Sequence, residues 1–355
     1  MPQEFNQPVH AFRGFAILNI AGIHAFAFIL IYARRSESPV GWPAEIAGLL
    51  NGVLLHDSTL YFTLISGILF SLVLAERGTA RFFRSKFLYV LLPYLFFTVL
   101  YSSGQPSGPP GSPPELFDGT LLEFIKLVAY NFVTGKAILI FWYMPVLLVL
   151  YMLTPLLAKI AQARDALWIH AIIICAPLVI SRTATEFSWQ SIVFFMGAYF
   201  VGMLVGANYR ATIELIEKHV VLLAVTAVVT SLSIVVLGHY GIENYGIFVP
   251  AQTAWYLQKF AIAALVLLWF ERVIEVVPRW LDALANYAFA LYFIHAFLLI
   301  QLVVWMGRND IKINNGFELI LYMSLSFAIA VGGSMLLIYI FKLLLRKYSR
   351  YIIGA

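Results

Sequence analysis

The sequence predicts an all-α polytopic integral membrane protein, with about ten transmembrane helices and a short interfacial helix on the outer side. Of its 355 residues, 62% are hydrophobic and only 12% are charged, and the mean hydropathy is +0.87. Soluble globular domains do not have this composition. Apolar runs long enough to cross a bilayer recur along the whole chain, which indicates one transmembrane domain over residues 1–355.

Transmembrane helices are expected wherever about 20 mostly apolar residues follow one another, because the hydrocarbon core is about 30 Å thick. The expected spans lie near residues 12–33, 50–75, 85–102, 137–158, 166–181, 189–207, 219–238, 252–271, 284–306 and 317–345. The first run lacks a small-x-small cleavage site near residue 30, so it predicts a retained helix and not a signal peptide.

Ten spans place both termini on the same side of the membrane. With the termini inside, the inner segments hold about twice as many Lys and Arg residues as the outer ones, and such residues favour the cytoplasmic side. We therefore expect cytoplasmic termini and a short basic cytoplasmic tail at residues 346–355.

Two segments between the third and fourth spans are expected outside the bilayer. Residues 102–120 are rich in Pro, Gly and Ser, which predicts an extended external loop. The next stretch, residues 120–134, begins with the capping-box pair Thr120 and Glu123. Its apolar and polar residues are expected on opposite faces of a helix. Because it is too short and too polar to span, it predicts a helix lying on the outer surface.

Arg13 and His24 are the first functional candidates, because ionisable residues within membrane spans are functional candidates by default. They lie eleven positions apart, which returns them to within roughly 20° of one helix face, about 16 Å apart along the axis. As a functional pair, Arg13 provides a fixed positive charge near the inner surface and His24 a neutral base at mid-depth. The structural alternative is an arginine that snorkels and a histidine that packs between helices.

A basic group, Arg81, Arg84 and Lys86, begins the third span. Arg81 and Arg84 are three positions apart and therefore adjacent on a helix surface, and guanidinium groups match phosphate oxygens. Together with Arg13 the group predicts a phosphate-binding mouth at the cytoplasmic face. The positive-inside pattern alone also accounts for it.

Four residues on the outer side are candidates for contact with an acceptor. His56 and Asp57 precede an apolar run, where Asp57 either caps the helix or helps His56 to orient an acceptor hydroxyl. Trp142 and Tyr143 stand at the outer start of a span and form either an aromatic belt or a sugar-stacking surface.

Three further polar side chains lie within spans. Tyr292 and His295 are three positions apart and share a helix face, which gives the protein a second buried histidine. Lys259 lies about a third of the way into the eighth span. At this depth its position fits a buried ion pair or a contact with the acceptor at least as well as it fits snorkelling to the outer surface.

Several familiar functional signatures are missing from the sequence. It contains no phosphate-binding loop, no dinucleotide glycine fingerprint, no nucleophile elbow and no His-Glu-x-x-His zinc motif. The single Cys175 excludes an internal disulfide, and no metal site is expected. The net charge of +5 is spread along loop edges without a nucleic-acid motif, so it indicates topology and not nucleic-acid binding.

These motifs together resemble those of acyltransferase family 3, the membrane-bound bacterial O-acyltransferases. The resemblance covers essentially the whole chain and rests on Arg13 with His24, Ser66-Gly67, Arg81-Phe-Phe-Arg84 followed by Pro93, Trp142-Tyr143-Met144-Pro145, and Tyr292-Phe-Ile-His295. Two features depart from the family pattern. His10 and Ala11 stand where an Asp often precedes the first-span Arg, and Asn286 stands where a Ser commonly precedes the late Tyr.

The resemblance implies a multi-pass protein of the bacterial cytoplasmic (inner) membrane. It would move an acyl group, usually acetyl from acetyl-CoA, to a hydroxyl of a carbohydrate or glycolipid acceptor at the membrane or its outer side. Acyl-CoA is then a substrate, and no bound cofactor is expected. On this analogy Arg13, Arg81 and Arg84, with Lys86 beside them, bind the donor's phosphates, and His24 lies where the thioester ends.

The sequence leaves the mechanism open. His24 either removes the proton of the acceptor hydroxyl during direct transfer or carries the acyl group itself. Lys259, Tyr292 and His295 are equal candidates to stabilise the oxyanion. A transporter or flippase of a polar or lipid-linked solute is the main rival, and a non-catalytic scaffold in a polysaccharide export assembly is the second. Dependence on an acyl donor separates an enzyme from a carrier. The scaffold is excluded if point changes at Arg13 or His24 abolish the modification while partner binding stays intact.

Overall fold

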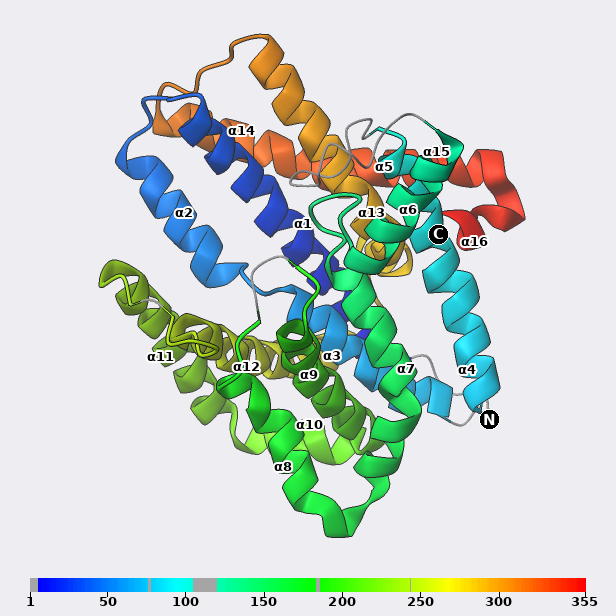
Figure 1. The fold of residues 1–355 in the computed structure, drawn as a ribbon. Helices are drawn as coiled ribbons and strands as arrows, with labels where there is room; N and C mark the ends of the chain where they lie inside the picture. The colour runs from blue at the N-terminus through cyan, green and yellow to red at the C-terminus, as the bar shows by residue number, and fades with distance from the viewer. Residues whose placement is uncertain (1–5, 76–77, 105–119, 183–185, 243) are drawn as a thin grey trace.

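The computed structural model of this protein describes residues 6–75, 78–104, 120–182, 186–242 and 244–355. These residues form helices joined by turns, and no β-sheet forms among them (Figure 1). The predicted all-α fold is confirmed for this part of the chain.

Nine helical segments among the described residues are long and apolar enough to cross a membrane. They are α1 (Gln7–Arg35), Trp42–Leu74, Thr79–Ser102, α7 (Tyr143–Gln162), α9 (Trp189–Ala207), α11 (Val220–His239), α12 (Pro250–Val273), α13 (Arg279–Arg308) and Gly316–Ile352. The expected span near residues 166–181 is a shorter apolar helix, α8 (Leu167–Cys175), followed by a 3-10 turn. Pro177 lies in that turn and has no N–H group to continue an α-helix.

Three of the long segments are composite. The second consists of α2 (Trp42–Leu54) and α3 (Thr59–Leu69), and the third of α4 (Thr79–Lys86) and α5 (Leu92–Ser102). The last consists of α14 (Gly316–Ala328), α15 (Ser334–Leu345) and α16 (Ser349–Ile352). The expected span near residues 50–75 therefore begins earlier than predicted and is broken by a turn at residues 55–58.

Two short helices connect the spans. The predicted helix over residues 120–134 is α6 (Leu121–Thr134), and the Thr120 hydroxyl accepts a hydrogen bond from the Glu123 N–H at 3.4 Å. The second is α10 (Tyr209–Lys218), between α9 and α11. Most of the expected external loop, residues 105–119, lies outside the described residues.

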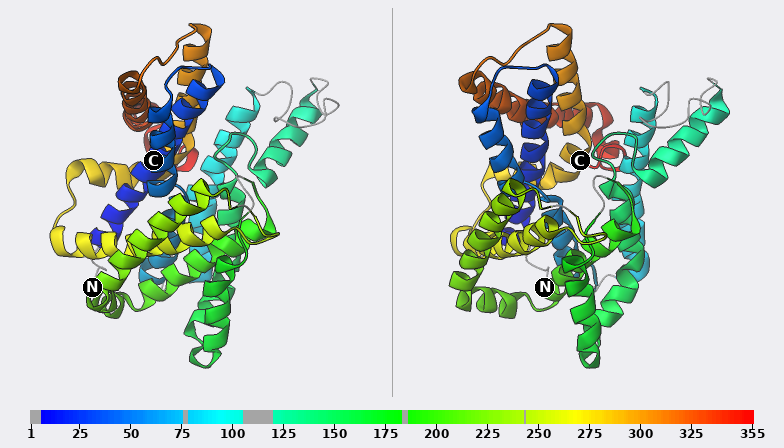
Figure 2. Two further views of the ribbon diagram at one scale, coloured as in Figure 1. Left: turned by 90° about the vertical axis from the view of Figure 1, so that its left-hand side faces the viewer. Right: turned by 60° about the vertical axis from the view of Figure 1, so that its left-hand side comes forward.

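Three helix pairs make the most extensive contacts: α1 with α13, α3 with α9, and α11 with α12 (Figures 1 and 2). Glycines bring α3 and α9 together. A Cβ atom at Gly67 would lie 2.1 Å from the Tyr199 carbonyl oxygen, and one at Gly202 would lie 2.1 Å from the Leu64 carbonyl oxygen. Small residues allow membrane helices to approach this closely, so these two positions set the distance between α3 and α9.

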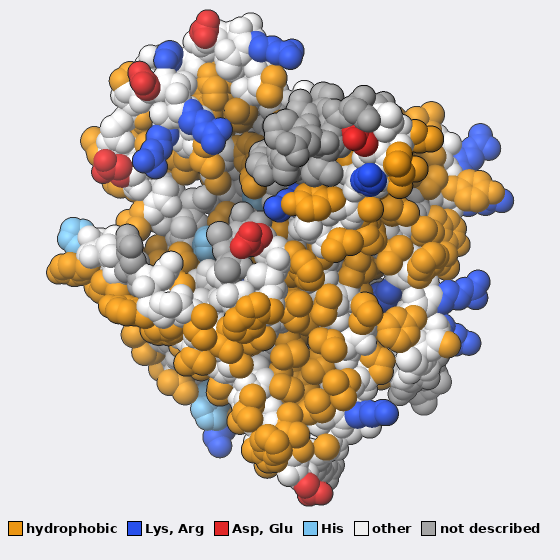
Figure 3. Space-filling view, in the orientation of Figure 1, with side chains coloured by type: hydrophobic (Ala, Val, Ile, Leu, Met, Phe, Trp, Pro, Cys, Tyr) orange, Lys and Arg blue, Asp and Glu red, His pale blue; other side chains and the backbone are white. Residues whose placement is uncertain are grey.

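The outer surface of the helices is largely apolar. In Figure 3, hydrophobic side chains cover much of the visible face, and Lys and Arg side chains gather towards its edges. On α11 the side chains of Val221, Leu222, Val228 and Leu232 are all more than half exposed. This distribution is the one expected for a surface in contact with lipid.

We predict that replacing either glycine of the α3–α9 contact destabilises the protein. Gly67→Ala or Gly202→Ala forces the two backbones apart, with an expected loss of roughly 1–3 kcal/mol. The measurement is thermal unfolding of the purified protein in detergent. Gly48→Ala on α2 is the control, because a Cβ there meets no atom within 4 Å. A Gly202→Ala protein that unfolds at the wild-type temperature would contradict the prediction.

Candidate functional site

A polar cavity of about 610 Å³ lies among α1, α3, α4, α7, α13 and the C-terminal segment. Arg13 and Ile20 of α1 line it, together with Tyr143 and Tyr151 of α7 and Tyr292 of α13. The cavity therefore follows α1 from Arg13 to within one helical turn of His24.

The cavity is basic. Arg13, Lys86, Lys342 and Arg350 all line it, and its described lining contains no Asp or Glu. None of these four side chains takes part in the ion pairs found among the described residues. The site thus presents several positive charges that no Asp or Glu side chain of its described lining neutralises, which suits a ligand with more than one negative group.

Three of the four cations lie over tyrosine rings. The Lys86 ammonium is 4.2 Å from the centre of the Tyr151 ring. The Lys342 ammonium is 4.4 Å from the Tyr287 ring, and the Arg350 guanidinium is 4.2 Å from the Tyr89 ring. Cation–π contacts hold a cation in place without cancelling its charge.

Two histidines face each other beyond the polar cavity. The ring centres of His24 on α1 and His295 on α13 are 5.4 Å apart. The Tyr292 ring, which lines the cavity, is 6.2 Å from the His295 ring. The close packing of α1 against α13 thus joins the two histidines predicted separately from the sequence to the cavity that contains Arg13.

The tautomer of His295 follows from its partner. Its Nδ1 lies 2.9 Å from the Leu291 carbonyl oxygen, which can only accept, so Nδ1 carries the hydrogen. The Nε2 atom is then an acceptor in the neutral ring. It is fully buried and has no hydrogen-bond partner among the residues that the structure describes. A buried nitrogen lone pair without a partner is available to orient a neighbouring donor such as the His24 ring.

Two tyrosines complete the inner part of the cavity. The Tyr292 hydroxyl donates to the Ile140 carbonyl oxygen. The Tyr143 hydroxyl lies 2.8 Å from the Thr63 hydroxyl, which itself lies 3.2 Å from the Thr59 carbonyl oxygen. Because Thr63 has one hydrogen and donates it to this carbonyl, it accepts from Tyr143.

A second polar cluster surrounds the turn between α2 and α3. The Asp57 carboxylate accepts from the Arg182 guanidinium at 2.6 and 2.9 Å, so its side chain forms an ion pair and does not cap α3. The same guanidinium lies 5.1 Å from the Trp142 ring, and His56 stacks on Trp255 with ring centres 3.9 Å apart. The structure therefore brings together three predicted residues and adds Arg182 and Trp255.

Lys259 has a structural partner. The last carbonyl groups of α2 have no continuing helix to bond, and α12 supplies the donors. Trp255 donates to Gly52 at 2.9 Å, Gln258 to Val53 at 3.0 Å and Lys259 to Leu54 at 2.7 Å. Residues three and four positions apart share a helix face, so one face of α12 caps the broken span.

Of the basic residues predicted at the start of the third span, only one lines the cavity. Arg81 and Arg84 are exposed on α4 and do not line the cavity, whereas their neighbour Lys86 does. Lys342 and Arg350 were not among the site residues predicted from the sequence. Lys342 could have been predicted as a site residue, because it lies within the last expected span, as Lys259 lies within the eighth.

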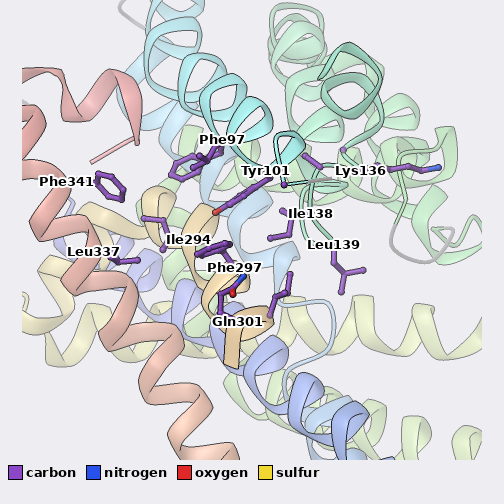
Figure 4. A pocket seen from close by; sticks show the side chains of 15 residues that line it. Phe97, Tyr101, Lys136, Ile138, Leu139, Ile294, Phe297, Gln301, Leu337 and Phe341 are labelled. Atoms are coloured by element: carbon purple, nitrogen blue, oxygen red, sulfur yellow. The ribbon is translucent and has the colours of Figure 1, made fainter. Parts of the chain in front are cut away.

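A second cavity, of about 690 Å³, lies between α5, α13 and α15 and residues 135–139 (Figure 4). Its lining is mostly apolar and includes Phe97, Phe297 and Leu337. Lys136 is the one cation of the described lining, and it donates to the Tyr130 hydroxyl at 3.0 Å. With no acid–base pair in its lining, this cavity suits an apolar group and not proton transfer.

The comparisons with known proteins identify one family. A family model described as an acyltransferase domain matches residues 8–339. No curated protein and no solved structure matches the chain.

We predict that the buried Asp57–Arg182 pair can be replaced only as a pair. Arg182→Met leaves a buried carboxylate without its cation, with an expected loss of roughly 3–5 kcal/mol. The double variant Asp57→Asn/Arg182→Met is expected to recover much of this loss, and Asn tolerates the φ of 55° at position 57.

The measurement is again thermal unfolding in detergent. Arg272→Met breaks the exposed Arg272–Glu217 pair, whose side chains are both 55% exposed, and serves as the control with an expected change below about 1 kcal/mol. A double variant as unstable as Arg182→Met would show that the uncompensated charge is not the cause.

Proposed function

The chain belongs to the acyltransferase family whose domain model matches residues 8–339, and from this premise we propose that it is a membrane O-acyltransferase. It takes an acyl group, with acetyl as the expected one, from cytoplasmic acyl-CoA. It passes the group to a hydroxyl of a carbohydrate or glycolipid at the membrane or its outer side. The proposal includes a bacterial cytoplasmic membrane as the location. It also includes cytoplasmic termini, which requires the shorter apolar helix α8 to return the chain across the membrane as a tenth crossing beside the nine long segments.

One observation carries the proposal: a single cavity connects Arg13 to Tyr292, beside the His24–His295 pair. In the proposed complex the donor's phosphates bind the basic residues Arg13 and Lys86. The pantetheine arm follows α1, where about 16 Å separates the levels of Arg13 and His24. The thioester then lies near the two histidines.

His24 acts as the base in this proposal, and His295 positions it. A small rotation of the facing rings lets His24 donate one N–H to the free Nε2 of His295. The other nitrogen of His24 then carries the lone pair that removes the acceptor's proton. In serine hydrolases a buried carboxylate likewise accepts from one nitrogen of the catalytic histidine and thereby leaves the lone pair on the other nitrogen.

Direct transfer then follows in balanced steps. The acceptor oxygen loses its proton to His24 and bonds to the thioester carbon, which leaves negative charge on the carbonyl oxygen. When the electron pair on this oxygen re-forms the carbonyl double bond, the carbon–sulfur bond breaks. The CoA thiolate that leaves then takes the proton from His24. Tyr292 lines the cavity beside His295, so we assign oxyanion stabilisation to it. For this role its hydroxyl group must turn to the oxyanion from the Ile140 carbonyl oxygen, to which it donates its one hydrogen in the structure. Lys259 is occupied in capping α2.

The acceptor is proposed to approach by way of the cluster around Trp142, His56 and Trp255. Trp142 is buried in this cluster, whereas the His56 side chain is 31% exposed and stacks on Trp255, so we assign the contact with the acceptor to His56. The buried Asp57–Arg182 pair holds the turn that carries His56.

We predict that His24→Ala lowers acyl transfer by roughly 10²–10⁴-fold, the usual contribution of a general base. CoA binding and thermal stability are expected to stay near wild type, because the change removes no phosphate contact. The measurement is transfer or hydrolysis of labelled acetyl-CoA by purified protein in detergent, joined to mass spectrometry of surface glycans and lipids from producing cells.

His239→Ala, at the exposed end of α11, is the matched control and should keep full activity. Activity in detergent also separates an enzyme from a carrier, which needs closed vesicles and a gradient. Normal transfer by His24→Ala at normal protein abundance would overturn the assignment of His24. A wild-type protein that neither binds CoA nor consumes acetyl-CoA would overturn the proposed function.

A further inference from the structure

The C-terminal segment folds back onto the basic cavity. Helix α15 ends at Leu345, and Arg346 has a φ of 48°, in the left-handed region that reverses the chain direction. The following helix α16 packs against α5 and the π-helical turn at Phe87–Leu91 (Figure 1). We use the name C-terminal segment for residues 342–355. Three of its residues, Lys342 near the end of α15, Arg350 in α16 and Gly354 after it, line the cavity.

Aromatic contacts hold the segment there. Tyr351 stacks on Tyr89 with ring centres 5.6 Å apart, while Arg350 lies over the same Tyr89 ring at 4.2 Å. Gly354 adopts a φ of 78°, and a Cβ there would lie 3.2 Å from Phe289. Replacing this glycine would therefore strain both its backbone and its packing.

Among the described residues, no Asp or Glu side chain forms an ion pair with Lys342 or Arg350. The Lys342 ammonium lies 2.5 Å from the Tyr287 hydroxyl oxygen. Arg350 is close enough to Arg13 for their like charges to interact. Placing like charges together at the edge of a membrane domain is unfavourable unless an anionic ligand binds between them.

We propose that Lys342 and Arg350 bind phosphate groups of the acyl donor, so that the C-terminal segment forms part of the donor site. The inference rests on the proposed function and goes beyond the family match, which ends at residue 339. Two sets of cations, Arg13 with Lys86 and Lys342 with Arg350, then recognise a donor with several phosphates. The tyrosines hold the cations extended towards the cavity before the donor binds, which lowers the entropy lost on binding.

The test is the affinity of purified wild-type and variant protein for CoA in detergent, measured by titration calorimetry at several salt concentrations. Arg350→Gln and Lys342→Gln are each expected to weaken CoA binding by about tenfold or more, because each removes a charge-assisted contact. Each is also expected to flatten the dependence of log Kd on log salt, because salt screens the attraction between the ligand and the site, and the site then has one charge fewer. A purely structural role would change the affinity without changing this slope.

Lys347→Gln is the matched control. Lys347 lies in the same segment, over the Tyr348 ring at 5.2 Å, and does not line the cavity. Wild-type affinity and slope are expected for it. Arg350→Lys should retain part of the affinity and the wild-type slope, since it keeps the charge.

The outcomes separate this inference from the proposed function. If wild-type protein binds CoA and Arg350→Gln and Lys342→Gln show unchanged affinity and slope, the inference is wrong and the proposed function stands. The same holds if affinity falls but the slope does not change. If wild-type protein does not bind CoA, both the inference and the assigned donor are wrong.

Discussion

The break in the second long helical segment is the constraint on which much of this structure depends. Backbone groups within a membrane domain must be satisfied by the protein itself, yet α2 ends at Leu54 and α3 begins at Thr59. Three side chains from one face of α12 bond the free carbonyl groups, and the buried Asp57–Arg182 pair holds the turn. The break thereby fixes α12 against α2 and directs α3 towards α9.

The pair of helices α1 and α13 arranges the chemistry. Arg13 lies on α1 in the basic cavity, and His24 lies further along the same helix, opposite His295 of α13. The two helices pack more extensively than any other pair described, so the distance between the two rings is set by the core of the protein. A proton-transfer pair built on rigid helices is held more accurately than one built on loops.

Tyrosines replace carboxylates as neighbours of the cavity's cations. A carboxylate beside Lys86 or Arg350 would compete with an anionic ligand, whereas a ring at 4.2 Å orients the cation and leaves its charge available. The positive charges of such a site are neutralised only when an anionic ligand binds. This explains how a mostly apolar domain contains a strongly basic cavity.

The fold class and most spans could be predicted because they depend on local composition and helix periodicity. The shared face of Arg13 and His24 is a prediction from the same periodicity within α1. Composition, periodicity and motifs thus indicated a helical membrane protein, the family that it resembles, and α1 as one helix of the candidate site. Three contacts could be seen only in the folded chain: His295 faces His24, Lys259 caps a broken helix, and Lys342 lines the basic cavity while Arg81 does not. Those contacts join residues hundreds of positions apart, and helix periodicity gives the direction of a side chain but not the helix that it meets.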